Sequence, residues 1–168
     1  RETGLSFETI SYEEEARLAL RGCQSLLTDG LPYALVFDIG GGSTELTWAR
    51  RNQVNSFEIL DVLSLPFGVV TLAEGCGRSD IDRRRYENMV SEIAGHLPPF
   101  CQKNKINKQV GAGQVQMLGT SGTVTTLGAV HLNLPRYSRS LIDGLELDFV
   151  SLDRATQMLS RLDYKRRA

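Results

Sequence analysis

Hydrophobic and polar residues in the first third of the chain follow patterns that predict one helix and three strands. Ser11 and the glutamates behind it are typical of a helix start, and apolar residues at helical spacing follow: Ala16, Ala19 or Leu20, Cys23 and Leu27. Residues 33–39 form a nearly continuous apolar run, which is typical of a buried strand. Residues 44–49 and 54–60 give two more strands. Because the connections are short, we expect an antiparallel meander.

The rest of the chain predicts helices mixed with short strands. A short helix is expected over residues 69–74 and a longer one over 81–101, capped by Ser79 or Asp80 and ended or bent at Pro98-Pro99. The residues of the longer helix expected to face inward are Tyr86, Met89, Val90, Ile93 and Leu97. The remaining expectations are a loop with a strand segment over 103–113, a strand over 115–118, a helix over 123–132, a hairpin-like stretch near 145–149 and a last helix behind Ser151 or Asp153.

Length and composition indicate one globular domain over residues 1–168. The chain is 41% hydrophobic and 23% charged, which is typical of a soluble protein. Its formal net charge is −1, so any polyanion must be bound by locally placed groups. Basic residues are not interleaved with aromatic ones, and we therefore expect no nucleic-acid partner.

The cysteines and the hydropathy predict a cytoplasmic protein without a membrane partner. Cys23, Cys76 and Cys101 lie far apart and show no metal-ligand spacing, which favours reduced thiols. We find no signal peptide and no apolar run of the roughly eighteen residues that a bilayer span needs. The chain begins without an initiator methionine, so we expect it to be part of a longer protein.

A glycine-rich segment between two of the predicted strands carries the strongest chemical signal. Its loop consists of Gly40, Gly41, Gly42, Ser43 and Thr44. Glycines let backbone N–H groups approach phosphate oxygens closely, and the two hydroxyls add donors. Asp38 ends the buried strand, where it can hold a metal ion, and Glu45 follows the loop. The alternative is a tight hairpin turn, but three successive glycines are entropically costly for a turn alone.

Two further segments have both a functional and a structural interpretation. Of the three acids at the first helix start, the helix dipole accounts for Glu13 and capping for Glu14, which leaves Glu15 as a candidate general base. By itself this segment favours a solvated helix start. The second segment, residues 118–123, runs from a strand into a helix, where backbone amides can bind an anion. An ordinary helix cap by Ser121 or Thr120 explains it equally well.

The order of these segments resembles the exopolyphosphatase/guanosine-pentaphosphate phosphatase (Ppx/GppA) family of the actin-like ATPase superfamily. The stretches that carry the resemblance are Ile-Ser-Tyr-Glu-Glu-Glu-Ala-Arg-Leu at 10–18, Val-Phe-Asp-Ile-Gly-Gly-Gly-Ser-Thr-Glu-Leu at 36–46, Gly-Thr-Ser-Gly-Thr at 119–123, and Leu-Pro-Phe-Gly-Val-Val-Thr-Leu at 65–72. The resemblance implies a ribonuclease-H-like α/β domain with a mixed sheet, an antiparallel three-stranded meander and flanking helices. It also implies that residues 1–168 are the second domain of a longer phosphatase, whose first domain is the missing partner.

The family's roles carry over by position. They imply Glu15 as the catalytic base, Asp38 as the residue that holds Mg²⁺ and its waters, and Glu45 as a second acid of the site. The loop from Gly40 to Thr44 would hold the phosphate that is cut. The cleft further along would be lined by Thr120, Ser121, Gly122 and Thr123. The implied reaction removes terminal phosphates from inorganic polyphosphate or guanosine pentaphosphate, and the sequence leaves both substrates open.

The chain also departs from the family pattern. Tyr12 stands where the family usually has glycine, and it would narrow the entrance or pack on Ala16. The phosphate loop of the first domain and the C-terminal helices do not occur, so we expect the chain to fold but to hydrolyse poorly alone. The resemblance implies dimers of the full-length protein. Two alternatives remain: another phosphotransferase or ATPase of the superfamily, and a non-catalytic sensor of polyphosphate or a nucleotide alarmone.

Overall fold

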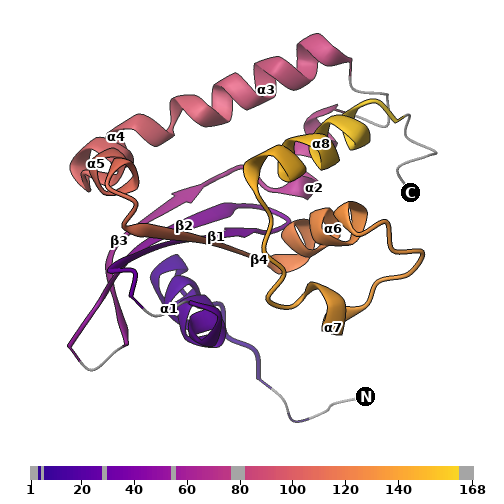
Figure 1. Ribbon diagram of the computed structural model, residues 1–168. Coiled ribbons are helices and arrows are strands. Elements are labelled where there is room, and N and C mark those ends of the chain that lie inside the picture. Colours follow the sequence, from indigo (N-terminus) through magenta and orange to yellow (C-terminus); the bar gives the residue numbers. More distant parts are fainter. Residues whose placement is uncertain (1–3, 5, 28–29, 54–55, 77–81, 163–168) are drawn as a thin grey trace.

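A computed structural model describes residues 4, 6–27, 30–53, 56–76 and 82–162 (Figure 1). Its strands are β1 (Tyr33–Ile39), β2 (Thr44–Arg51), β3 (Phe57–Leu65) and β4 (Val115–Thr120). Its helices are α1 (Tyr12–Cys23), the 3₁₀ turn η1 (Gln24–Leu26), α2 (Val69–Cys76), α3 (Arg83–Gly95), α4 (Leu97–Lys103), α5 (Ile106–Gly111), α6 (Ser121–His131), α7 (Arg139–Ile142) and α8 (Phe149–Ser160).

The four strands form one mixed sheet in the order β3-β2-β1-β4. β2 pairs antiparallel with both β1 and β3, while β1 pairs parallel with β4. The predicted meander is therefore confirmed, and its short turns explain why its strands run antiparallel. The fourth strand reaches the other side of β1 only after the helices α2 to α5. The fold is α/β, with helices on both sides of the sheet.

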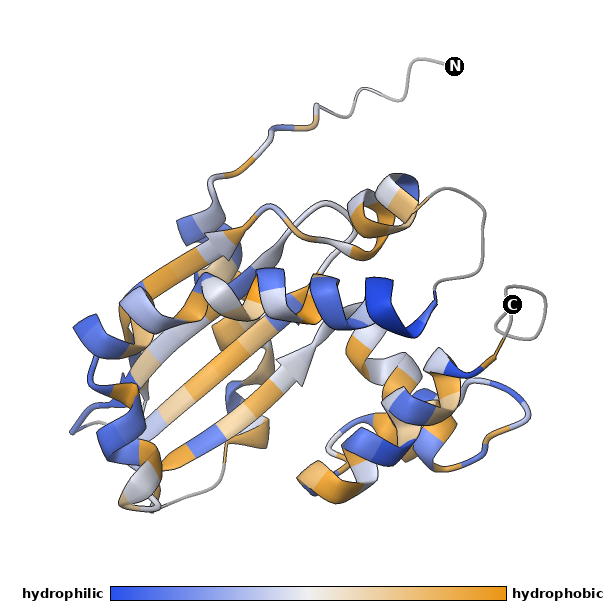
Figure 2. Ribbon diagram, turned by 90° about the horizontal axis from the view of Figure 1, so that it is seen from above, coloured by the Kyte–Doolittle hydropathy of each residue, from blue (hydrophilic) through white to orange (hydrophobic). Residues whose placement is uncertain are grey.

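Each face of the sheet has its own apolar cluster. On the lower face in Figure 1, Leu20 and Cys23 of α1 pack with Ala34, Val36 and Ala49. On the upper face, the buried cluster consists of Trp48, Phe100 and Ile106, from β2, α4 and α5. Successive residues of a strand point to opposite faces, so β1 contributes alternate residues to the two clusters. Figure 2 shows the apolar centre of the sheet and the hydrophilic start of α3.

The predicted long helix over residues 81–101 is two helices, α3 and α4, joined at His96. Pro98 lies in the first turn of α4, where a missing N–H removes no hydrogen bond of the helix. The helix cap is Asp82, whose Oδ1 accepts a hydrogen bond from the Arg85 amide at 2.7 Å. The expected caps Ser79 and Asp80 lie outside the described residues. The expected inward face is confirmed only in part: Met89, Ile93 and Leu97 are half-buried, and none of the described residues of α3 is fully buried. Its exposed members include Tyr86 and Val90.

Two further expectations were wrong. Residues 103–113 contain helix α5 in place of a loop with a strand segment, because Ile106 is buried against Trp48 and Phe100. Lys105 begins this helix with a left-handed φ of 54°, which lets the chain turn sharply out of α4. Residues 145–148 form no strand, and Asp148 caps α8 by accepting a hydrogen bond from the Ser151 amide.

The other predicted strands and helices agree with the structure to within a few residues. Strand β3 is displaced along the chain: it was expected over 54–60, but it runs from Phe57 to Leu65. Residues 54 and 55 lie outside the described part of the chain. Among the helices that are described, none is both long and apolar enough to cross a membrane.

Replacement of Trp48 by alanine should lower the free energy of unfolding by about 3–5 kcal/mol. The reason is that this side chain is 1% exposed and its ring stacks on that of Tyr33 with centroids 5.0 Å apart. Urea denaturation followed by circular dichroism measures the loss. Val110→Ala is the control, since Val110 is 54% exposed and should change stability by less than about 0.5 kcal/mol. Equal losses in both variants would contradict the assignment of Trp48 to the core.

Candidate phosphate-binding site

The two acids that flank the glycine loop face each other across β1 and β2. Asp38 is the direct cross-strand partner of Glu45, so their side chains lie on the same face of the sheet. That face also carries Val36 and is covered by α1. Glu45 is only 4% exposed, and its Oε1 accepts a hydrogen bond from Ser64 Oγ at 3.0 Å. The Oδ2 atom of Asp38 accepts one from Thr120 Oγ1 at 2.9 Å.

The backbone of the glycine loop is held by the first turn of α2. The Val69 N–H donates to the Gly40 carbonyl at 3.0 Å, and the Val70 N–H donates to the Gly41 carbonyl at 2.8 Å. In a trans peptide the N–H points away from the preceding carbonyl, so the amides of Gly41 and Gly42 are turned away from α2. Neither amide donates to a group in the described part of the chain, and both residues are exposed. These two amides are free to bind an anion.

Gly68 makes this contact between α2 and the loop possible. A Cβ atom at this position would lie 2.3 Å from both the carbonyl carbon and the carbonyl oxygen of Gly41. It would also lie 2.5 Å from the Gly42 nitrogen. Real Cβ atoms do not approach backbone atoms this closely, so any other residue at position 68 must displace the loop or the helix. The direction of the loop amides therefore depends on Gly68.

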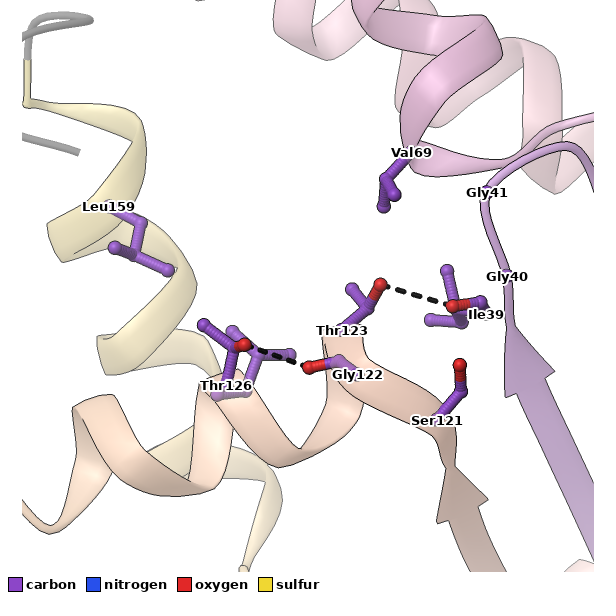
Figure 3. Close-up of a pocket in the computed structure, with 10 residues that line it drawn as sticks. Ile39, Gly40, Gly41, Val69, Ser121, Gly122, Thr123, Thr126 and Leu159 are labelled. Carbon is purple, nitrogen blue, oxygen red and sulfur yellow. Dashed lines mark hydrogen bonds between the residues drawn. The ribbon is translucent and has the colours of Figure 1, made fainter. Parts of the chain in front are cut away.

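The turn between β4 and α6 opens into a cavity of about 550 Å³ (Figure 3). One side is formed by Ile39, Gly40 and Gly41, and another by the first turn of α6, with Ser121, Gly122 and Thr123. Leu127 of α6 and Leu159 of α8 add apolar walls. The acids Asp38 and Glu45 do not line it. Ile39 does, because it points to the face of β1 opposite to that of Asp38.

The residues at the start of α6 differ in what their side chains contact. Thr120 is the N-cap residue but makes no side-chain cap hydrogen bond, so the ordinary capping interpretation does not hold for it. Its hydroxyl donates to Asp38, and the Thr123 hydroxyl donates to the Ile39 carbonyl at 3.1 Å. Ser121 takes a left-handed φ of 79°, which is uncommon for a residue with a side chain. The unpaired amides at the start of a helix favour anions.

Of the three glutamates at the start of α1, only Glu15 lacks a side-chain partner among the described residues. The pKa of Glu13 is lowered, first by a hydrogen bond from the Tyr12 hydroxyl. Glu14 pairs with Arg17, so it does not complete a capping box, although Ser11 Oγ accepts from the Glu14 amide at 3.3 Å. The side chain of Glu15 is exposed beside the buried Ala16. Of the three glutamates, Glu15 is therefore the one whose side chain is available to a ligand.

Helix α1 places Glu15 on the same side of the sheet as Asp38 and Glu45. The thiol of Cys23, on the same helix, agrees with this arrangement. Burial raises the pKa of this thiol, and the nearby charge of Asp38 raises the pKa further. Among the described residues, no three acids, histidines or cysteines come close enough to share a metal ion. Glu15 thus lies on the same side of the sheet as Asp38 and Glu45, but in the described part of the chain the three acids do not form a cluster.

The loop residues predicted to hold phosphate are not equivalent in the structure. The Gly40 amide donates to the Ser43 carbonyl at 3.0 Å, and the Thr44 hydroxyl donates to the Phe67 carbonyl at 2.6 Å. Both groups therefore stabilise the loop. Two residues that matter for the geometry were not among the candidates from the sequence, namely Ser64 and Gly68. Gly68 does lie in the stretch 65–72 that resembles the Ppx/GppA family.

The mixed sheet, the acid-glycine loop and the strand-to-helix turn at the start of α6 are those of an actin-like ATPase domain. The sequence profile of the Ppx/GppA phosphatase family matches residues 1–167. The chain belongs to this family.

Curated and solved relatives agree with this assignment. Exopolyphosphatase 2 of Mycobacterium tuberculosis is 26% identical over 98% of this chain and 49% of its own length. The Ppx/GppA phosphatase of Aquifex aeolicus, in its type II variant, superposes with a TM-score of 0.74 and 26% identity over 99% of this chain and 51% of its own. An exopolyphosphatase-like protein gives a TM-score of 0.76 and 27% identity over 98% of this chain and 51% of its own. The chain thus spans about half the length of these relatives.

Gly68→Ala should displace the glycine loop and lower stability by about 1–3 kcal/mol through overpacking. It should also weaken the binding of Mg²⁺-tripolyphosphate to the chain, measured by isothermal titration calorimetry. Gly75→Ala is the matched control, because Gly75 lies in α2, the helix that directly follows Gly68, and a Cβ there would meet nothing within 4 Å. Unchanged stability and binding in the Gly68 variant would show that α2 does not determine the direction of the loop.

Proposed function

We propose that this chain is the phosphate-binding half of an enzyme that hydrolyses the terminal phosphoanhydride bonds of inorganic polyphosphate or guanosine pentaphosphate and releases orthophosphate. The observation that carries the proposal is the orientation of the glycine loop. Its Gly41 and Gly42 amides face away from α2, and the Asp38–Glu45 pair lies directly at the two ends of the loop. Amides and acids in this arrangement suit a phosphate together with its counter-ion.

The proposed mechanism consists mainly of positioning and electrostatics. The amides of Gly41 and Gly42 and the hydroxyl of Ser43 would hold the oxygens of the terminal phosphate. Glu15, exposed and without a partner in the described part of the chain, would accept a proton from the attacking water. The first turn of α6, with Ser121, Gly122 and Thr123, would contact phosphates further along the substrate.

The acid pair has the chemistry that a Mg²⁺ ion requires. Mg²⁺ prefers oxygen ligands and is usually held by one or two carboxylates, with waters and substrate phosphates completing its shell. Asp38 and Glu45 each have one oxygen that accepts a hydroxyl and one without a partner among the described residues. All buried side-chain N and O atoms described have hydrogen-bond partners, so solvent reaches the second oxygens. Asp38 and Glu45 would hold Mg²⁺, which would offset the charge of the phosphate.

The site described here would be one half of a cleft. Relatives of this family are about twice as long as this chain, and we propose that a first domain supplies the opposite wall. The chain alone would then bind phosphate but hydrolyse it slowly. Both substrates end in the same kind of phosphoanhydride, so the loop serves either one. Dimers of the full-length protein and a cytoplasmic location belong to the same proposal.

Glu15→Gln and Asp38→Asn should each lower phosphate release from polyphosphate by about a hundredfold or more, because each removes a group proposed to act on the reacting atoms. Release is measured in a fusion of residues 1–168 to the half of the Aquifex aeolicus protein that the chain does not match. Glu13→Gln in the same fusion is the control for loss of an acid at the start of α1. Near-parental rates in both test variants would refute the assignment.

Removal of Mg²⁺ by a chelator should abolish phosphate release by the same fusion, and added Mg²⁺ should restore it, because the acid pair alone repels a phosphate. Colorimetric phosphate assays at a series of free Mg²⁺ concentrations test this. Tight Mg²⁺-dependent binding of polyphosphate without any release would favour the sensor alternative. Binding of an ATP analogue without polyphosphate hydrolysis would favour another ATPase of the superfamily.

A further inference from the structure

Four polar side chains form a single row across the whole sheet. Ser64 is the direct cross-strand partner of Glu45, Glu45 that of Asp38, and Asp38 that of Thr120. The row therefore crosses β3, β2, β1 and β4 in their spatial order. The two acids occupy the inner strands, and a hydroxyl stands on each outer strand. Each hydroxyl donates to the acid beside it, at 3.0 Å from Ser64 and 2.9 Å from Thr120.

The side-by-side placement of Asp38 and Glu45 in this row is energetically unfavourable unless other groups interact with the two carboxylates. Like charges on directly opposite strand residues repel each other, and Glu45 is 96% buried as well. A hydroxyl donor offsets part of this cost, because hydrogen bonds to charged groups are stronger than those between neutral ones. The hydroxyl donor also fixes the rotation of the carboxylate. Because one carboxylate oxygen is held by the donor, the second oxygen must point away from that donor.

We propose that Ser64 and Thr120 are positioning residues for the acid pair. Each hydroxyl holds one carboxylate oxygen at the outer side of the row, so that the second oxygens of Glu45 and Asp38 are directed to a shared cation. This inference rests on the proposed function, in which the two acids hold Mg²⁺. It changes the role of Thr120, which the family resemblance assigns to the cleft lining. It also adds Ser64, which carries no role in that resemblance.

A hydroxyl on the same face without contact to an acid provides the comparison. Thr47 is 3% exposed and is the next residue of β2 on the face that carries Glu45. Its hydroxyl makes no hydrogen bond in the described part of the chain. Thr47→Val therefore removes a hydroxyl from the same sheet face without removing a donor from the row.

The test uses Mg²⁺-tripolyphosphate binding to the chain, measured by isothermal titration calorimetry. Ser64→Ala and Thr120→Val should each weaken binding about tenfold, as is typical for residues that orient metal ligands. Ser64→Thr and Thr120→Ser keep the donor and should restore most of the affinity. Thr47→Val should bind like the parental chain. Urea midpoints measured in parallel show whether a variant has only lost stability.

The possible outcomes separate the inference from the proposed function. If Glu45→Gln weakens binding but Ser64→Ala and Thr120→Val do not, the positioning role is refuted and the proposed function stands. If the parental chain does not bind, or Glu45→Gln binds like it, the proposed function fails and the inference fails with it. Equal affinities of Ser64→Ala and Ser64→Thr would also refute the inference. A crystal structure of Ser64→Ala should show a rotated Glu45 carboxylate.

Discussion

The hydrogen bonds from the first turn of α2 to the carbonyls of Gly40 and Gly41 determine what the glycine loop presents to a ligand. A peptide unit that turns its oxygen to the helix must turn its N–H the other way. The contact requires that Gly68 has no Cβ, since an added atom would lie 2.3 Å from the Gly41 carbonyl. A segment after the third strand therefore controls a loop that lies before the second strand.

The register of the sheet determines where the two acids of the site lie. Direct pairing of Asp38 with Glu45 places two carboxylates side by side, and the neighbouring strands supply one hydroxyl to each. The cavity between the loop and α6 opens on the other side of β1, since it is lined by Ile39 and not by Asp38. The acids and the cavity thus lie on opposite sides of β1 and are connected by the glycine loop and by Thr120, which precedes α6 and donates to Asp38. A phosphorylated substrate in the loop would have the acids on one side and the α6 turn on the other.

The strands of the meander, the glycine loop and the acids could be predicted from the sequence, because each has a strong local signal. Ser64 was missed, because β3 was expected to end at residue 60, short of the position opposite Glu45. Continuing the strand to residue 65 in register would have placed Ser64 opposite Glu45. The helix at 106–111 was missed because it is short and its buried residue, Ile106, packs with Trp48, which lies far away in the sequence.

The fold class, the family and the residue types at the site could be predicted before any coordinates, because they follow from local periodicity and from contiguous motifs. Which groups are free to act became clear only from the folded structure. The hydroxyls of Thr44, Thr120 and Thr123 donate to other parts of the protein, while the Gly41 and Gly42 amides donate to no group among the residues that the structure describes. A hydrogen-bond partner dozens of residues away leaves no local trace in the sequence, and that is why the roles within the motif could not be assigned before the strands were paired.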